Sequence, residues 1–378
     1  MSLNLLRLFY ALQLASIAAL VPLLGGRFEK AGIPGFTIGL LMATLPAGRL
    51  IATPIWAFVA DRYRVAGLVL RISCVTSGIA GVVLASSTKL PVIAVAMLAF
   101  SALRAPIGAI LDSFVVEELR NRGRHASEYG QIRLFGSLGF VVSLVTASWL
   151  DRFGISSVPM AWLALGGGAL LSFRFPAGGE GGPAPIMPAV RALLRRPFLA
   201  PLLLGGAFQA LTLSVYDTFF SVHISALGLP GVVVGACVGI GVTGEMLLMA
   251  FGRPLFARLR PANALLLAAA TGIPRWIVTA VATDPTILVL TQALHAVGFG
   301  AFWLAGVQRM ATAAPPQIAA SAQSLWGAST YGFGALVGAI LAGRVLGEWG
   351  SSSVFLLLAG CSTMATICAL WMRAVDRN

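Results

Sequence analysis

The sequence predicts an all-α integral membrane protein with twelve transmembrane helices, arranged as two six-helix bundles. Composition is the first reason: of 378 residues, 58% are hydrophobic and only 10% are charged, whereas a typical soluble chain carries about 25% charged residues. Length is the second reason, because a spanning helix needs about 20 apolar residues and twelve such helices fit into this chain with short connections. An internal repeat is the third reason, since it divides the chain into two halves.

Apolar runs that end at charged residues, Pro or Gly give the positions of the expected helices. The first six helices are expected at residues 3–26, 36–60, 66–87, 90–116, 131–150 and 159–175. The second six are expected at residues 198–221, 232–257, 263–283, 286–312, 321–343 and 353–373. The segment between the two sets, 176–197, is predicted to be a cytoplasmic linker, and its Pro- and Gly-rich part, 176–188, is predicted to be flexible. The predicted domains are therefore 1–175 and 198–378.

The repeat is seen when the chain is shifted by 196 residues. Gln13 then falls on Gln209, and many glycines coincide. The basic turn at 62–64 falls on the one at 258–260. Such a shift preserves the direction of every helix, so the halves are expected to be parallel repeats related by an axis along the membrane normal. Two bundles related in this way are expected to face each other across a central cavity.

Most basic residues lie between the apolar runs, so the net charge of +13 is interpreted as a membrane topology signal, with no nucleic acid as a partner. If the N-terminus is cytoplasmic, sixteen Lys and Arg residues fall at inner loops and helix ends and five fall at outer ones. This asymmetry predicts a multi-pass protein of a bacterial-type inner (plasma) membrane with both termini in the cytoplasm. We expect a monomer whose partners are the lipid bilayer and a small-molecule substrate.

Cysteines and glycines are expected to serve helix packing. The cysteines lie in apolar runs and lack the spacing of a metal site or a disulfide. They are Cys74, Cys237, Cys361 and Cys368. Gly136 and Gly139, and the glycines of 327–338, permit close contacts between helices. No metal and no cofactor is predicted, apart from a proton as the coupling ion.

Ionisable residues within the apolar runs are the first functional candidates, since each costs about 2.5 to 3.5 kcal/mol on insertion scales. The repeat pairs Arg49 with Glu245 in the middle of their helices. In the functional interpretation Arg49 attracts substrate and Glu245 takes up a proton; the alternative is a structural charge pair. Arg275 and His295 lie on the next two helices and complete a predicted proton relay. Asp217 is a candidate for proton entry or an outer gate, with a solvated helix end as the alternative.

A further set of residues is predicted to bind substrate. Gln292, His295 and Phe299 have the spacing of one helical face, and Trp303 extends it. This face is either a packed interface or an aromatic wall of the cavity. The deep arginines likewise have either a structural role or a role in substrate binding. The predicted substrate-binding residues are Arg49, Arg104, Gln13, Gln209, Gln292, Phe299 and Trp303.

Near the cytoplasmic side, Asp112 approaches Arg133 at the start of the next predicted helix. We interpret this pair as a structural gate or charge network. The segment 54–64, PIWAFVADRYR, resembles the signature that the major facilitator superfamily carries between its second and third helices, with Ala57 in place of the usual Gly. The resemblance implies that Asp61 and Arg62 have a gating or structural role.

The segment 129–140, YGQIRLFGSLGF, is the most specific match, and it is similar to a segment of transporters like the 3-phenylpropionate transporter. The resemblance covers essentially the whole chain and extends to the branch with lactose permease and the nucleoside/proton symporters. It implies that Glu245, Arg275 and His295 match a set that lactose permease uses in proton coupling. That permease also has an acidic residue one turn beyond its His, where this chain has Gly298 and Phe299, so its scheme does not transfer whole.

These observations predict a secondary active transporter, not an enzyme, that takes up a small organic solute with protons by alternating access. Three deep arginines against Glu245 and Asp217 favour an organic or aromatic acid over a nucleoside or a sugar. A proton-driven efflux antiporter is the alternative, although the helix at 131–150 lacks the Gly-Pro-rich motif of drug/proton antiporters. A membrane-embedded transferase is a remote alternative, because the clustered catalytic acids that it needs are missing from the sequence.

Overall fold

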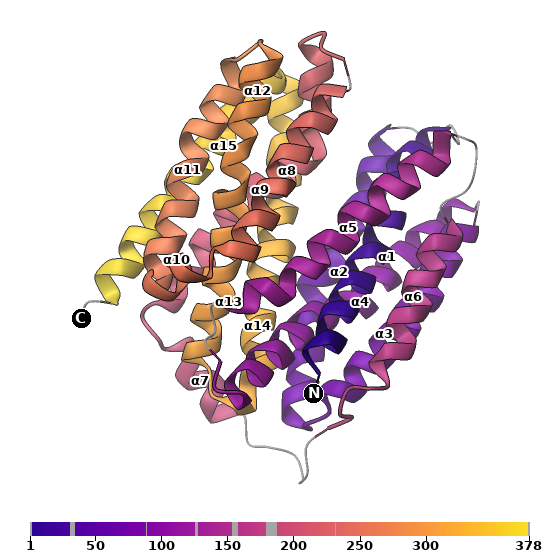
Figure 1. The fold of residues 1–378 in the computed structure, drawn as a ribbon. Coiled ribbons are helices and arrows are strands. Elements are labelled where there is room, and N and C mark those ends of the chain that lie inside the picture. Colours follow the sequence, from indigo (N-terminus) through magenta and orange to yellow (C-terminus); the bar gives the residue numbers. More distant parts are fainter. Residues whose placement is uncertain are drawn as a thin grey trace. The chain divides into compact units, whose positions relative to one another are not determined.

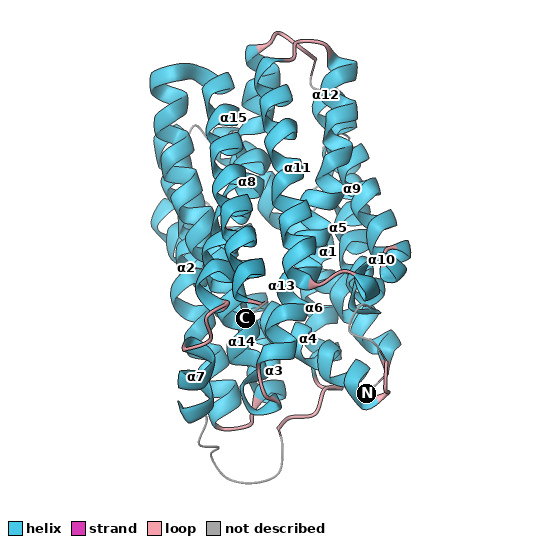
Figure 2. Cartoon of the chain, turned by 90° about the vertical axis from the view of Figure 1, so that its left-hand side faces the viewer, coloured by secondary structure: helices cyan, strands magenta, loops and turns pink. Residues whose placement is uncertain are grey.

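The computed structural model describes residues 2–30, 35–87, 89–124, 128–152, 158–178, 187–230 and 232–376. Within these residues the chain is almost entirely helical and contains no strand (Figures 1 and 2). The prediction of an all-α fold is therefore confirmed.

The membrane-spanning helices can be identified by length and hydropathy. Ten helical stretches among the described residues are long and apolar enough to cross a membrane. The last of them, Pro316–Val375, contains two spans, because Gly350 interrupts it with a φ of 78° and a ψ of 176°, a conformation that favours glycine. The apolar helix Val158–Ser172 is shorter, with 15 residues. With this helix and the division at Gly350, the described residues contain twelve apolar helices, which correspond to the twelve predicted transmembrane helices.

The chain forms two compact units. Unit 1 comprises Met1–Val190 together with Ala314–Ala328, and unit 2 comprises Arg191–Ala313 together with Ser329–Asn378. The sequence analysis placed Ala314–Ala328 in the C-terminal domain, and its domain boundaries stay a prediction. Within the predicted linker, Met187–Leu194 form a short helix, α7, because the segment is rich in helix formers and has Pro at its second position. Residues 179–186 lie outside the described residues.

Unit 1 is a bundle whose main contacts are between α1 and α5 and between α2 and α4. Its helices are α1 (Leu3–Lys30), α2 (Gly35–Arg62), α3 (Ala66–Ser86), α4 (Leu90–Asn121), α5 (Tyr129–Arg152), α6 (Val158–Ser172) and α14 (Ala319–Gly327). A side chain at Gly139 of α5 would overlap the backbone of Ala11 on α1, with Ala11 Cα at 2.7 Å from the added Cβ. Gly136, one turn earlier, lies against Leu14. These glycines serve close helix packing, as predicted.

Unit 2 is built around α15, which packs on α8 and on α11. Its helices are α8 (Leu199–Ala226), α9 (Val232–Phe251), α10 (Arg253–Arg258), α11 (Pro261–Val281), α12 (Pro285–Thr291), α13 (Phe302–Ala313) and α15 (Ala335–Val375). Tyr216, Trp276 and Phe355 form an aromatic core, with ring centroids 5.6 Å apart for Tyr216 and Trp276 and 6.2 Å apart for Trp276 and Phe355. Between α12 and α13 the chain forms a 3₁₀ turn, Gln292–Leu294, and a π-helical turn, Ala296–Ala301.

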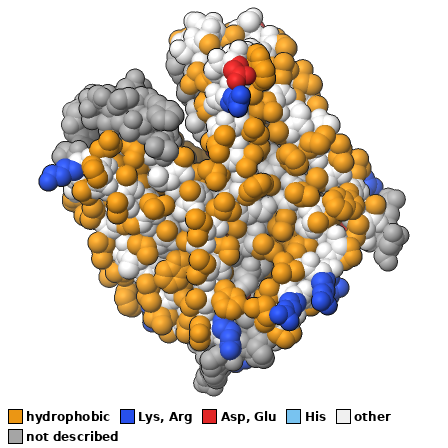
Figure 3. All heavy atoms as spheres, turned by 180° about the vertical axis from the view of Figure 1, so that it is seen from behind, with side chains coloured by type: hydrophobic (Ala, Val, Ile, Leu, Met, Phe, Trp, Pro, Cys, Tyr) orange, Lys and Arg blue, Asp and Glu red, His pale blue; other side chains and the backbone are white. Residues whose placement is uncertain are grey.

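Hydrophobic side chains cover much of the surface. On the face shown in Figure 3 they extend over most of the area, and Lys and Arg side chains occur in scattered groups. Leu163, Phe251 and Ile51 are 77%, 75% and 68% exposed. A water-soluble protein rarely exposes apolar patches of this extent, so this surface is suited to lipid. The four cysteines are buried and free, as predicted.

Candidate functional site

The predicted relay residues Glu245 and His295 lie side by side in unit 2. Glu245 is on α9 and is 6% exposed. His295 precedes the π-helical turn, and its Nε2 lies 3.8 Å from Glu245 Oε2. The imidazole stacks on Phe299, with the two ring planes 5° from parallel and their centroids 5.7 Å apart. At this distance the two groups are not hydrogen bonded, but they attract each other electrostatically when the imidazole is protonated.

Glycines on α9 bring the two helices close enough for this contact. A Cβ added at Gly241 would lie 3.2 Å from His295 Cβ, and one added at Gly244 would lie 3.0 Å from Ala296 Cβ. Both distances are shorter than an ordinary contact between carbon atoms. The small residues on α9 therefore set the separation of Glu245 from His295.

Arg275 is held by neutral partners. The side chain is 1% exposed, and its Nε and Nη2 donate to Gln292 Oε1 at 2.9 and 2.7 Å. Its guanidinium carbon lies 4.0 Å from the ring centroid of Trp276 and 4.6 Å from that of Tyr216. Gln292 Nε2 donates in turn to Thr279 Oγ1 at 3.2 Å. In the described part of the chain, no carboxylate forms an ion pair with Arg275.

Asp217 lies on α8 and its side chain is exposed. It is close enough to Arg275 and Glu245 to interact electrostatically with both. The structure thus gathers the four residues predicted for proton coupling, Glu245, Arg275, His295 and Asp217, within unit 2. Their role in coupling stays a prediction.

Three of the predicted substrate-binding residues gather in unit 1. Arg104 on α4 is buried and donates through Nη2 to the backbone carbonyl of Gln13 on α1. Gln13 Nε2 donates to Cys74 Sγ at 3.4 Å. Arg49 on α2 is partly buried and is near enough to Arg104 for their charges to interact. Unit 1 therefore brings two arginines close together.

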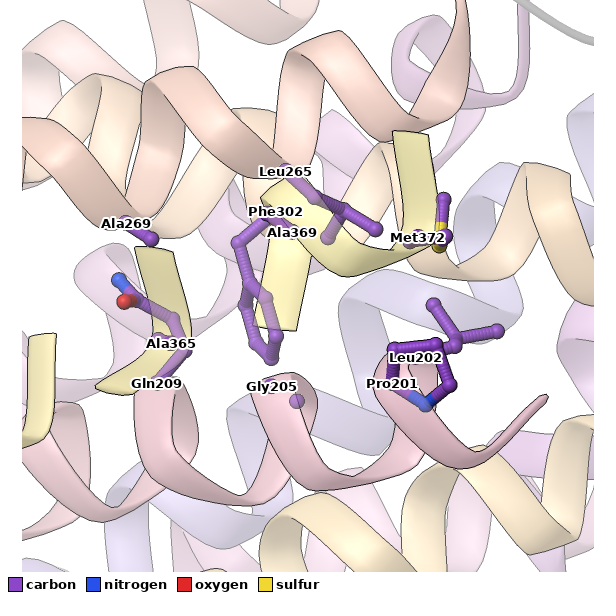
Figure 4. Close-up of a pocket in the computed structure, with 11 residues that line it drawn as sticks. Pro201, Leu202, Gly205, Gln209, Leu265, Ala269, Phe302, Ala365, Ala369 and Met372 are labelled. Atoms are coloured by element: carbon purple, nitrogen blue, oxygen red, sulfur yellow. The ribbon is translucent and has the colours of Figure 1, made fainter. Parts of the chain in front are cut away.

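The other predicted substrate-binding residues lie in unit 2, where Gln292 contacts Arg275 as described. Gln209 on α8 is buried and donates through Nε2 to the carbonyl of Gly298 at 2.9 Å. It also lines a small pocket between α8, α11, α13 and α15 (Figure 4). The other side chains that line this pocket are apolar. Trp303 is buried beside Tyr331, with ring centroids 5.2 Å apart. Substrate contact by this set stays a prediction.

Asp112 is bound by two tyrosines that the sequence analysis did not single out. Its Oδ1 accepts hydrogen bonds from Tyr10 on α1 and from Tyr129 on α5, the latter at 2.7 Å. Arg133 lies over the Tyr10 ring, 5.7 Å from the ring centroid. The predicted network around Asp112 and Arg133 thus includes two phenol groups, and it connects three helices of unit 1.

Asp61 binds the start of α14 within unit 1. Its Oδ1 accepts from the backbone N–H of Ala320 at 3.3 Å and its Oδ2 from that of Ser321 at 2.6 Å. These N–H groups belong to the first turn of a helix, where they have no partner inside the helix and carry partial positive charge. Arg62 lies over the Tyr63 ring at 5.9 Å. The carboxylate thus attaches α14 to α2.

His223 is another residue that the sequence analysis missed. Its ring is fully buried, and its nitrogens lie 2.9 Å from Thr279 O and 2.9 Å from Ser351 Oγ. It thereby connects α8 with α11 and with the residue after Gly350. The signal in the sequence was a histidine inside an apolar run.

Comparison with known proteins agrees with this architecture. The MFS_1 like family matches residues 3–357. Maltose permease of Geobacillus stearothermophilus is 29% identical over 98% of this chain and 94% of its own length. The probable 3-phenylpropionic acid transporter of Escherichia coli is 31% identical over 49% of this chain and 50% of its own length. The solved structure of the E. coli fucose:proton symporter superposes with a TM-score of 0.74 at 14% identity, covering 98% of each chain.

The family match extends over nearly the whole chain, and the relatives and structural neighbours are transporters rather than enzymes. The twelve helices and the buried charges on both units fit such a protein. The chain is therefore a multi-pass membrane transporter of small solutes and belongs to the MFS_1 like family of the major facilitator superfamily.

Proposed function

We propose that this transporter takes up an organic anion together with protons by alternating access, across a bacterial-type inner membrane with both chain termini in the cytoplasm. The observation that carries the proposal is the buried pair of Glu245 and His295 beside an Arg275 that has neutral partners. It combines a group that can hold a proton with a group that can attract an anion.

The proton part of the proposal rests on chemistry within the membrane. Ionisable side chains within membrane-spanning helices are rare and usually functional. Glu245 and His295 are both mostly buried, and their polar atoms lie 3.8 Å apart. Proton uptake by either group changes the charge of the pair. Arg275 and Asp217 are close enough for their own charges to interact with it. The name of the fucose:proton symporter, whose fold is similar, is consistent with proton coupling.

The anion part rests on two buried guanidinium groups. Arg275 donates to a glutamine side chain and Arg104 to a backbone carbonyl. A buried charge is costly unless an opposite charge compensates it, and in the described residues neither arginine has a carboxylate at ion-pair distance. A substrate carboxylate can supply that compensation through two parallel hydrogen bonds. The name of the 3-phenylpropionic acid transporter supports this class of substrate, and the name of maltose permease supports a neutral sugar as the alternative.

The substrate class can be tested by thermal unfolding of the purified protein in the presence of carboxylates, their neutral amides, nucleosides and sugars. A ligand that binds the folded state raises the unfolding temperature. We expect carboxylates to do so and their amides not to, and we expect the shift to be lost in Arg275→Gln. Stabilisation by sugars, with no response to carboxylates, would contradict the anion proposal.

Proton coupling can be tested in proteoliposomes with the carboxylate that this screen identifies. An inward proton gradient should drive accumulation in the wild type and not in Glu245→Gln, while exchange of labelled for unlabelled substrate continues. Glu117→Gln, at an exposed glutamate of α4, is the matched control and should accumulate substrate normally. Gradient-driven accumulation by Glu245→Gln would exclude Glu245 as the coupling residue.

A further inference from the structure

The spanning segment that carries His295 changes its helical geometry directly after this residue. Gln292–Leu294 form a 3₁₀ turn, and Ala296–Ala301 form a π-helical turn before α13 begins. A π-helical turn contains more residues than an α-helical turn, so it rotates the residues before it relative to those after it. The direction in which His295 points, relative to α13, therefore depends on whether this turn persists.

A side chain from another helix bonds to the middle of the π-helical turn. Gln209 of α8 donates through Nε2 to the carbonyl of Gly298 at 2.9 Å. Gln209 is 3% exposed, and its Oε1 is buried without a hydrogen-bond partner. The position of the amide is thus set by the bond that its Nε2 makes. An added Cβ at Gly298 would lie 3.7 Å from Gln209 Nε2, an ordinary van der Waals distance, so the bond to the Gly298 carbonyl does not depend on glycine at this position.

The π-helical turn also contacts α9, the helix that carries Glu245. Gly244 of α9 touches Ala296, the first residue of the turn, and an added Cβ at Gly300 would lie 2.9 Å from Leu248 Cδ2. Phe299, inside the turn, stacks on the His295 ring. The turn thus packs on α11 and on α9, which carries Glu245, and Gln209 bonds to it from α8.

We propose that Gln209 is a positioning residue, whose amide holds the π-helical turn and thereby keeps His295 against Glu245. Its consequence for transport rests on the proposed proton coupling by Glu245 and His295. The geometric part can be measured without any transport.

The measurement uses histidine labelled with ¹⁵N in the purified full-length protein. The chain has three histidines, so the His295 resonances can be assigned from their loss in His295→Gln. When Glu245→Gln is the only substitution, it should shift the titration midpoint of His295. In Gln209→Met, which keeps the length of the side chain and removes the donor, we expect the His295 resonances to move. We also expect at least half of the response to Glu245→Gln to be lost.

Two further variants make the result specific. Gln13→Met changes the repeat-related glutamine of unit 1 and should leave the His295 resonances in place. Gln209→Glu can donate to Gly298 O when its carboxyl group is protonated. At low pH its His295 resonances should therefore match those of the wild type at the same pH, and at high pH they should differ from them. It also provides a test if Gln209→Met does not fold.

The inference is overturned if the His295 resonances and their response to Glu245→Gln are the same in the wild type and in Gln209→Met, or if Gln209→Glu shows no such pH dependence. Failure of the proposed function gives a different result. In that case Glu245→Gln accumulates substrate normally, while Gln209→Met still moves the His295 resonances.

Discussion

At the residue scale, Arg275, Asp112 and Asp61 illustrate three kinds of partner that a charged side chain has in this protein. Arg275 has a glutamine amide and two aromatic rings, Asp112 has two phenol hydroxyls, and Asp61 has the backbone N–H groups at the start of α14. In a bilayer, where water does not replace a lost partner, an unsatisfied polar group costs several kcal/mol. Each of these partners should therefore matter for stability.

Replacing Tyr10 by Phe tests this for Asp112. The change removes one of two hydroxyl donors from a buried carboxyl group, and a hydrogen bond to a charged group contributes about 1.5 to 3 kcal/mol. We expect Tyr10→Phe to unfold at a lower temperature than the wild type in a detergent thermal-unfolding assay. Tyr63→Phe, at a tyrosine that is 53% exposed, is the control and should leave the unfolding temperature unchanged. Equal unfolding temperatures for Tyr10→Phe and the wild type would show that the bond from Tyr10 is dispensable.

The residues of the site differ in how well they could be predicted. Glu245, Arg275 and His295 could be predicted because an ionisable residue in an apolar run is rare and costly. Tyr10, Tyr129 and the bond from Gln209 to Gly298 could not, because neutral polar residues are common in such runs and their partners are distant in the sequence. The hydrogen bonds between Arg275 and Gln292 could not be predicted either, because the two residues lie on different helical segments and hydropathy does not show which of their faces meet.

At the scale of elements, close helix contacts and local helix geometry position the site. The helices themselves could be predicted, since hydropathy averaged over a span needs no tertiary information. The π-helical turn at Ala296–Ala301 could not, because its geometry depends on contacts with α8 and α9. The short helix Met187–Leu194 could not be predicted, because it lies at the end of a stretch rich in Pro and Gly.

The contact between α1 and α5 can be tested at Gly139. A methyl group there would overlap the Ala11 backbone, and backbone cannot move aside as a flexible side chain can. Overpacking of this kind costs about 1 to 3 kcal/mol, so we expect Gly139→Ala to lower the unfolding temperature and the yield of folded protein. Gly166→Ala on α6, where an added Cβ meets nothing within 4 Å, should match or exceed the wild type in stability. A Gly139→Ala protein as stable as Gly166→Ala would contradict the close contact.

The start of α12 gives a pH-dependent prediction outside the membrane spans. Asp284 caps this helix by accepting from the backbone N–H of Thr286 at 2.7 Å and of Ile287 at 3.1 Å. The backbone N–H groups of Ile287 and Thr286 hold the pKa of Asp284 below its usual range. A depressed pKa means that the ionised form stabilises the folded state at neutral pH, and that this stabilisation is lost as the pH falls through the folded-state pKa.

We therefore expect Asp284→Ala to unfold at a lower temperature than the wild type at pH 7, with a difference that shrinks as the pH falls below about 4, the ordinary pKa of Asp. Thermal unfolding of both proteins across this pH range is the measurement. A difference that stays constant down to the lowest pH would show that the charge of the cap is irrelevant.

At the scale of the whole molecule, the repeat places equivalent positions in both halves of the sequence and lets their chemistry differ. Gln13 and Gln209 are each the eleventh residue of their helices, α1 and α8. Unit 1 brings Arg49 and Arg104 together, whereas unit 2 brings Glu245 and His295 together. This division is the basis for assigning proton coupling to unit 2 in our proposal.

The most direct test of that assignment measures protons and substrate in the same vesicles. Proteoliposomes with a pH-sensitive dye in the lumen receive a carboxylate that stabilises the purified protein, without any imposed pH gradient. We predict that the lumen of wild-type vesicles acidifies as labelled substrate enters, and that Glu245→Gln vesicles show no acidification. Substrate entry without acidification in the wild type, or equal acidification with Glu245→Gln, would contradict proton coupling at Glu245.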